Sequence, residues 1–204
     1  MSEEKTLNYY DQHAREWAEK HHGFDETSFW KPWMEKLQKY LPSGKLIEIG
    51  SGTGKDAANL VALGFDYVGT DASQGLLELA RQRNPEIAFK KVRIQDLTEM
   101  FEEDMFDGFW SAATLLHIPK NEIDLALSNI HNVVKHDGFG FISVKEGTEE
   151  KEDENGRFYA YYTMEEFSNT LSSNSFEIKE TETVTSPDGT VWLLYIVRIG
   201  VTNS

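Results

Sequence analysis

Short apolar runs rich in β-branched residues alternate along the chain with segments in which apolar residues recur every three or four positions. The runs predict strands at 46–49, 65–70, 87–94, 106–111 and 139–145. The segments between them predict helices at 56–63, 73–83 and 120–135, with turn residues at Gly64, Asn84-Pro85 and Asp137-Gly138. This alternation predicts an α/β fold with a mostly parallel sheet and helices on both faces.

The two ends of the chain follow other patterns. Residues 1–43 are dense in aromatic residues and predict a helical cap, whose rings either pack on the core or close over a ligand pocket. After a charged loop at 149–155, Thr163 and Glu166 form a capping box that predicts a helix. The segments 176–184 and 191–197 flank a turn and predict a hairpin. We expect one domain over 1–204: a cap (1–43), a core (45–145), a candidate substrate lid (146–162) and a C-terminal helix and hairpin (163–198).

Composition narrows the class of protein. The 204 residues include 20 Lys and Arg against 35 Asp and Glu, a net charge of −15, which disfavours nucleic acid and anionic membranes as partners. Cysteine is absent, which excludes disulfides, thiolate metal sites and a cysteine nucleophile. No apolar run approaches the roughly 18 residues of a membrane span, and the N-terminus lacks a signal core. We expect a soluble, cytoplasmic protein.

The first candidate site is a glycine-rich segment, Glu48-x-Gly50-x-Gly52-x-Gly54, directly after a predicted strand. Glycines let the backbone turn sharply and approach a ligand closely. The spacing differs from that of a phosphate-binding Walker loop and from that of the dinucleotide fingerprint. An NAD(H) reductase is therefore disfavoured.

Two further candidate sites follow the next strands. Asp71 comes after the second strand, where its carboxylate can accept hydrogen bonds from both hydroxyls of a ribose, although Asp is also a common helix cap. Asp96, in Gln95-Asp96-Leu97 after the third strand, can accept from an adenine amino group, or can simply cap a turn. Ligands of open parallel sheets bind at the carboxyl ends of the strands, so these residues are expected to gather at one edge.

Residues 45–145 resemble the class I S-adenosylmethionine-dependent methyltransferases. The resemblance rests on IEIGSGTG, VGTDAS, IQDL, FDGFWSAATLLHI and VVKHDGFGFISVKEG, in the order typical of that class. It implies a Rossmann-like sheet of seven strands whose last strand is antiparallel. A more local pattern, running from Trp110 to Pro119 together with Gly156-Arg157-Phe158, is similar to a bacterial subgroup that methylates small molecules.

The resemblance also implies the cofactor, S-adenosyl-L-methionine, with S-adenosyl-L-homocysteine as product, and a set of contacts to it. The glycine segment should line the methionine part, Asp71 the ribose, Asp96 the adenine, and Ser111 with Ala112 the sulfonium. The full set of expected cofactor contacts is Glu48, Gly50, Ser51, Gly52, Gly54, Asp71, Ala72, Gln95, Asp96, Leu97, Ser111, Ala112 and Tyr10.

The acceptor site is predicted from what methyl transfer needs. His117 follows the fourth strand and is either a general base, for an acceptor that must lose a proton, or a wall of the pocket. Arg157 either pairs with an acceptor carboxylate or phosphate or pairs with its own acidic loop. Tyr161 and Trp110 complete the expected acceptor contacts, and no metal site is expected.

Two functions remain open at this stage. The first is an enzyme, a monomer or homodimer, that methylates O or N of a small molecule or short peptide. The second is a non-catalytic S-adenosylmethionine-binding sensor or partner subunit. An ordered acceptor pocket lined by His117, Arg157 and aromatic rings would favour the enzyme.

Overall fold

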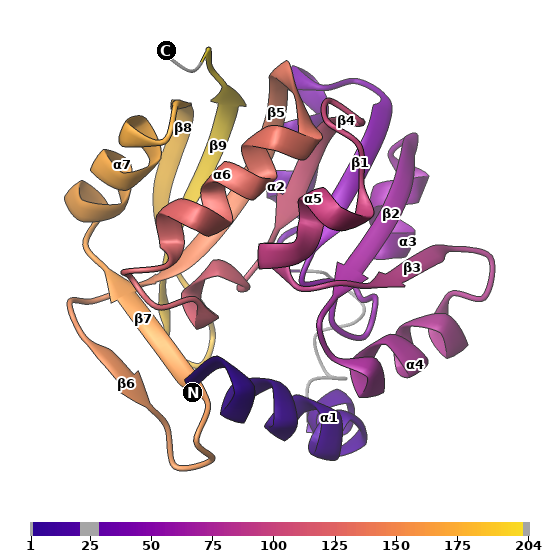
Figure 1. The fold of residues 1–204 in the computed structure, drawn as a ribbon, viewed down its shortest axis with the longest axis vertical. Coiled ribbons are helices and arrows are strands. Elements are labelled where there is room, and N and C mark those ends of the chain that lie inside the picture. The colour runs from indigo at the N-terminus through magenta and orange to yellow at the C-terminus, as the bar shows by residue number, and fades with distance from the viewer. Residues whose placement is uncertain (1, 21–28, 202–204) are drawn as a thin grey trace.

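The computed structural model describes residues 2–20 and 29–201, arranged around one central sheet (Figure 1). The part of the expected helical cap at 21–28 lies outside the described residues. The strands are β1 (Gly44–Ile49), β2 (Phe65–Asp71), β3 (Ala88–Lys91), β4 (Phe106–Ser111), β5 (Val134–Glu146), β6 (Glu150–Glu152), β7 (Phe158–Tyr162), β8 (Phe176–Thr185) and β9 (Val191–Ile199).

The predicted sheet is confirmed. Strands β3, β2, β1, β4 and β5 are parallel neighbours in that order, and β9 then pairs antiparallel with both β5 and β8. Two strands come in addition to the predicted seven. Strand β7 pairs with the end of β5 at Lys145 and Glu146, and β6 pairs antiparallel with β7. The charged loop expected at 149–155 therefore contains a strand, which also bonds through its side chains to Lys5 and to the backbone of Lys120.

Helices cover both faces of the sheet, as the alternating pattern predicted. The helices are α1 (Ser2–Lys20), α2 (Lys31–Tyr40), α3 (Ala57–Ala62), α4 (Gln74–Arg83), α5 (Leu97–Met100), α6 (Ile123–Val133) and α7 (Met164–Ser173), with short 3-10 turns η2 (Ile94–Asp96) and η3 (Leu115–His117). Helices α2, α3 and α4 pack on one face, around Leu46 and Phe141, and α5, α6 and α7 pack on the other, around Ile47 and Ile142. None of the helices in the described ranges has both the length and the apolar composition needed to cross a bilayer.

Helix α1 lies across the edge at which the parallel strands end (Figure 1). The Asp11 carboxylate accepts hydrogen bonds from the Ser73 hydroxyl (2.6 Å) and the Gly75 amide (3.0 Å) at the start of α4. At the other end of the helix, the Thr6 hydroxyl accepts from the Phe158 amide at 2.8 Å. Helix α1 is thus anchored on both sides of the carboxyl edge, the edge at which the parallel strands end. The sequence predicts the candidate site residues at this same edge.

Candidate functional site

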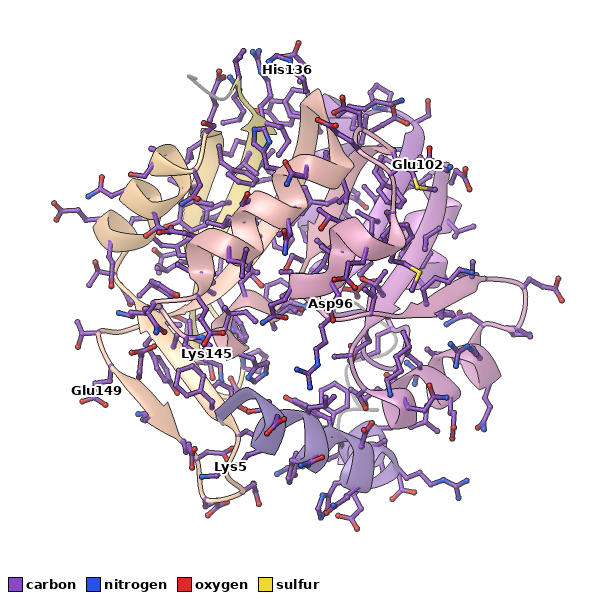
Figure 2. The ribbon with its side chains drawn as sticks, viewed as in Figure 1. Lys5, Asp96, Glu102, His136, Lys145 and Glu149 are labelled. Atoms are coloured by element: carbon purple, nitrogen blue, oxygen red, sulfur yellow. The ribbon has the colours of Figure 1, made fainter. Side chains whose placement is uncertain are left out.

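A cavity of about 410 Å³ lies at the carboxyl edge of the sheet, beneath α1. This volume falls within the usual range for small-molecule sites. Figure 2 shows Asp96 and Lys145 toward this edge, while Glu102 and His136 lie at the opposite edge. The cavity is therefore built by the loops after the strands, as expected for an open α/β sheet.

The glycine segment after β1 brings bare backbone to the cavity. Gly50, Gly52 and Gly54 all have positive φ, at 74°, 53° and 68°, a region that side chains other than glycine rarely adopt. A Cβ on Gly50 would collide with Thr114, whereas a Cβ on Gly52 would meet no protein atom within 4 Å. Gly50 and Gly52 line the cavity; Gly54 does not and instead packs close to α4. The open side of Gly52 is a cradle that a ligand can fill.

Asp71 lies at the end of β2, directly opposite the glycine segment. Its Oδ2 accepts a hydrogen bond from the Gly52 amide and its Oδ1 accepts one from the Ser73 amide, both at 2.8 Å. Burial raises the pKa of Asp71, and these two hydrogen bonds oppose the rise. Each oxygen can accept a further bond, so the carboxylate remains able to receive two hydroxyl groups.

Glu48 lies at the cavity wall, almost fully buried at 3% exposure. Burial raises its pKa well above the usual range, and the charge of Asp56 raises it further, although the Tyr67 hydroxyl donates a hydrogen bond to its carboxylate. These influences favour the neutral acid, which can donate a hydrogen bond as well as accept one.

Trp110 was expected to contact the acceptor, and the structure places it elsewhere. Its ring is fully buried, stacked on Phe141 with centroids 4.1 Å apart, and does not line the cavity. Its indole N–H donates to the Asp56 carboxylate at 3.0 Å. Trp110 therefore belongs to the core beneath the glycine segment, and we no longer expect it to touch the acceptor.

The turn after β3 shows a similar difference. Leu97 is fully buried in the core, and Gln95 and Asp96 are partly exposed without lining the cavity. The cavity wall here consists of Val92, Arg93 and Ile94. The side-chain amide of Asn129 donates to the carbonyls of Ile94 (3.1 Å) and Gln95 (2.8 Å), which fixes the turn.

The segment after β4 contributes backbone and small side chains. Ala112, Ala113 and Thr114 line the cavity, while Ser111 is fully buried behind them. Ala113 has a positive φ of 55°, and its amide donates to the Ser143 hydroxyl at 2.8 Å. Of the two residues expected near a sulfonium, Ala112 faces the cavity and Ser111 does not.

His117 lies in the cavity wall with both ring nitrogens engaged. Nδ1 is 2.7 Å from the Phe158 carbonyl oxygen, an acceptor, so Nδ1 carries the proton. Nε2 is 3.1 Å from the Tyr10 hydroxyl and must then accept from it. Burial lowers the pKa of His117 to about 4, with Lys145 and Arg157 adding to the effect. The histidine is therefore neutral and held in one tautomer.

Arg157, at the start of β7, fits both of its predicted roles. Its guanidinium lies 2.7 Å from the Asp153 carboxylate, in the acidic loop, and it also lines the cavity. The same guanidinium packs over the rings of Tyr10 and Tyr159, at 5.9 and 5.5 Å from their centroids. Of the expected Tyr161 and its neighbour Tyr159, only Tyr159 lines the cavity.

The cavity also contains residues that the sequence did not single out. They come from β5, from β7, and from the hairpin turn and the start of β9. Lys145 lies opposite Trp192 in the pairing of β5 with β9, and this pairing brings both residues to the cavity. The sequence of one strand does not reveal its register with another strand, so the two residues could not be predicted to meet. These residues are Lys145, Tyr159, Ser186, Asp188, Thr190 and Trp192. In the described part of the chain, no three His, Asp or Glu side chains gather as a metal site would require.

Comparison with known proteins finds a matching family and several curated relatives in sequence. Residues 46–138 match a family described as "Methyltransferase domain". The protein-L-isoaspartate O-methyltransferase of Chlorobaculum parvum is 37% identical over 89 residues, which are 43% of this chain and 41% of that protein. The chain spans between 11% and 51% of the length of the curated relatives it matches.

Solved structures match over most of the chain. The 1,6-didemethyltoxoflavin-N1-methyltransferase of Burkholderia thailandensis, with bound 1,6-didemethyltoxoflavin and S-adenosylhomocysteine, has a TM-score of 0.79 and 21% identity, covering 96% of this chain and 88% of that one. The [4+2]-cyclase SpnF has a TM-score of 0.69 and 19% identity, covering 84% and 81%. At these identities the likeness concerns the fold, and one fold can serve more than one reaction.

Proposed function

Because the chain contains a methyltransferase domain of the class I S-adenosylmethionine-dependent type, we propose that it transfers a methyl group to oxygen or nitrogen of a small molecule. The cofactor is S-adenosyl-L-methionine. The observation that carries the proposal is that one cavity contains both the Gly52–Asp71 pair and a separate polar end around His117 and Arg157. A sensor would need only the first of these.

The residues at the first end fit the cofactor. The unfilled side of Gly52 leaves room for a ligand against the backbone, and Asp71 retains acceptor capacity for two ribose hydroxyls. Asp71 also repels a 2′-phosphate, and Val92 and Ile94 offer apolar surface to a purine. When bound, S-adenosylmethionine would supply a methyl group attached to a positively charged sulfur. A lone pair of the acceptor would bond to the methyl carbon from the side opposite the sulfur, as the carbon–sulfur bond breaks and leaves S-adenosylhomocysteine.

At the other end, the chain's contribution is to position the acceptor and to exclude water. Alignment alone can supply a large part of the rate gain in a two-reactant step. Helix α1 closes this end, and Tyr10 and Tyr159 give it rigid aromatic walls. We propose that residues 1–43 and 146–162 act as the cap and lid over a core at 45–145.

The geometry favours a positioning role for His117 over a base. Nε2 is occupied by the Tyr10 hydroxyl, and a pKa of about 4 makes the ring a weak proton acceptor near neutral pH. We propose that His117 orients Tyr10. Replacing His117 by Gln should then raise KM with kcat within about tenfold of normal, whereas loss of a positioned base lowers kcat by roughly 10²–10⁴-fold.

Two measurements test the proposed function. Calorimetry should show that S-adenosylhomocysteine binds and that NAD does not. A screen of small-molecule acceptors with methyl-labelled cofactor should then give a labelled product. Binding of S-adenosylhomocysteine without transfer to any acceptor would favour the non-catalytic sensor, and binding of NAD instead would contradict the cofactor assignment.

A further inference from the structure

Lys145 is a cation in the cavity that the proposed function does not yet use. It lies near the end of β5, partly buried, with its Nζ 4.2 Å from the ring centroid of Tyr159 and 5.7 Å from that of Trp192. Within the described ranges 2–20 and 29–201, no carboxylate lies within ion-pair distance of this Nζ. Burial lowers the pKa of Lys145, and the charge of Arg157 lowers it further. The charges of Asp188 and Asp153 oppose this decrease, but within the described residues neither carboxylate forms an ion pair with the ammonium group.

A second cation lies on the same wall. The Arg157 guanidinium packs over Tyr159, the ring that also carries Lys145. Asp153 balances Arg157 through an ion pair of 2.7 Å. The charge of Asp188, in the hairpin turn, acts on Lys145, but in the described part of the chain the two side chains form no ion pair; Oδ1 of Asp188 accepts hydrogen bonds from the Ser186 hydroxyl and the Thr190 amide. Lys145 is thus the cation at this end that is available to a ligand.

The surroundings of Lys145 are flat and aromatic. Trp192 lies opposite Lys145 in the pairing of β9 with β5, and Trp30 meets Trp192 edge to face, with centroids 5.2 Å apart. Tyr10, Tyr159 and both tryptophans line the cavity. Aromatic walls favour planar apolar ligands, and a half-dehydrated ammonium favours an anion. The chain's net charge of −15 repels anions at long range, so any preference for one must come from these local cations.

We propose that the methyl acceptor is a small planar molecule that carries a carboxylate, which pairs with Lys145. The inference rests on the proposed function, because it identifies the occupant of the acceptor end. Lys145 is here a specificity-determining residue.

The test compares matched pairs of planar probes in which a neutral carboxamide takes the place of the carboxylate. Benzoate and benzamide, and 2-naphthoate and 2-naphthamide, are titrated by calorimetry into the full chain saturated with S-adenosylhomocysteine. Each carboxylate should bind about tenfold more tightly than its amide, the size expected for one charge-assisted hydrogen bond. In Lys145→Met, which keeps the apolar stem, this preference should disappear while the amides bind as before.

Lys151→Met is the matched control. Lys151 also lies over a tyrosine, at 4.8 Å from the Tyr161 centroid, but on β6 and outside the cavity lining. Its replacement should leave the preference for carboxylates unchanged, and thermal melts should show all three proteins folded. Equal binding of acids and amides, no binding of either acid, or a preference that survives in Lys145→Met would overturn the inference.

This outcome is separable from failure of the proposed function. If S-adenosylhomocysteine does not bind, the methyltransferase proposal is wrong, and the same probe pairs on the free protein still decide whether Lys145 selects carboxylates. If S-adenosylhomocysteine binds and the pairs show no preference, only the acceptor class is wrong.

Discussion

The amide of Gly52 donates a 2.8 Å hydrogen bond to the Asp71 carboxylate, which joins the loop after β1 to the end of β2. These residues lie 19 positions apart, and the two strands that they follow and end, β1 and β2, are parallel neighbours in the sheet. The bond holds the Asp71 carboxylate next to the open side of Gly52. The same contact therefore places a negative charge beside the space that a ligand can occupy.

Replacing Gly52 by Val should abolish binding of S-adenosylhomocysteine. The new side chain would project into the cavity, and φ at this position is +53°. Calorimetry should show a loss of well over tenfold. Gly64→Val is the control, because Gly64 also has a positive φ, of 96°, and nothing within 4 Å of a Cβ, yet lies outside the cavity lining. If both variants bind normally, the glycine segment is not the cofactor site.

Replacing Asp71 by Ala should weaken binding of S-adenosylhomocysteine by about 1.5–3 kcal/mol, since it removes charge-assisted hydrogen bonds to the ribose. Asp66→Ala changes an exposed carboxylate on the same strand and should leave the affinity unchanged. Calorimetry on both variants, alongside thermal melts, separates lost contacts from lost folding. Equal affinity in the two variants would remove Asp71 from the cofactor site.

His117 should titrate with a midpoint near 4 and carry its proton on Nδ1 below and above pH 7 alike, because burial and the Phe158 carbonyl fix the neutral tautomer. Two-dimensional ¹H–¹⁵N NMR of the imidazole measures both properties. A folded-state pKa below the unfolded value means that the unfolded chain binds more protons. Wild type should therefore lose stability relative to His117→Gln as the pH falls from about 6.5 to 4. A midpoint near 6.5 would contradict this account and restore the base.

Glu48→Gln should make the protein more stable at neutral pH. Burial raises the pKa of Glu48, so the folded chain retains a proton that the unfolded chain releases above about pH 4.5. The free energy of unfolding of wild type therefore decreases as the pH rises above about 4.5, whereas Glu48→Gln does not titrate and shows no such decrease. Urea unfolding of the two proteins should diverge in favour of Glu48→Gln between about pH 5 and pH 8. Parallel pH curves would show that Glu48 is ionised in the fold.

The sequence predicted the sheet well because its strands are marked by apolar runs and its loops by glycine and acidic residues. Strands β2, β4 and the β8–β9 hairpin lie within a few residues of their predicted positions. Strand β6 was missed because its residues, Glu150–Glu152, are all polar and exposed, and backbone pairing with β7 leaves no trace in hydropathy.

The sequence predicted the candidate site correctly only where neighbouring residues determine the backbone conformation. The positive φ of Gly52 and the place of Asp71 at a strand end follow from their own neighbourhoods. The burial of Trp110 depends on Asp56, 54 residues away, and the exposure of Lys145 to the cavity depends on the pairing of β5 with β9. Such long-range contacts determine which side chains of a strand face the cavity, and they cannot be predicted from the pattern of a single sequence.

The last prediction concerns access to the cavity, which α1 covers. Asp11 is the polar link between α1 and the start of α4, since its carboxylate accepts from both the Ser73 hydroxyl and the Gly75 amide. Hydrogen bonds to a charged group contribute about 1.5–3 kcal/mol each, so Asp11→Ala should increase the opening of α1 by at least about tenfold. Hydrogen exchange across residues 2–20 should accelerate, and S-adenosylhomocysteine should dissociate faster.

Gln74→Ala is the matched control, because Gln74 is the first residue of α4 and, among the described residues, its side chain donates to Glu78 on the exposed side of that helix, at 3.2 Å, and not to α1. It should leave both rates unchanged. Strands β1 and β4 should exchange equally slowly in all three proteins, because their core does not involve Asp11. If α1 exchanges normally in Asp11→Ala, apolar packing of Ala14 and its neighbours holds the helix in place, and ligand entry must use another route.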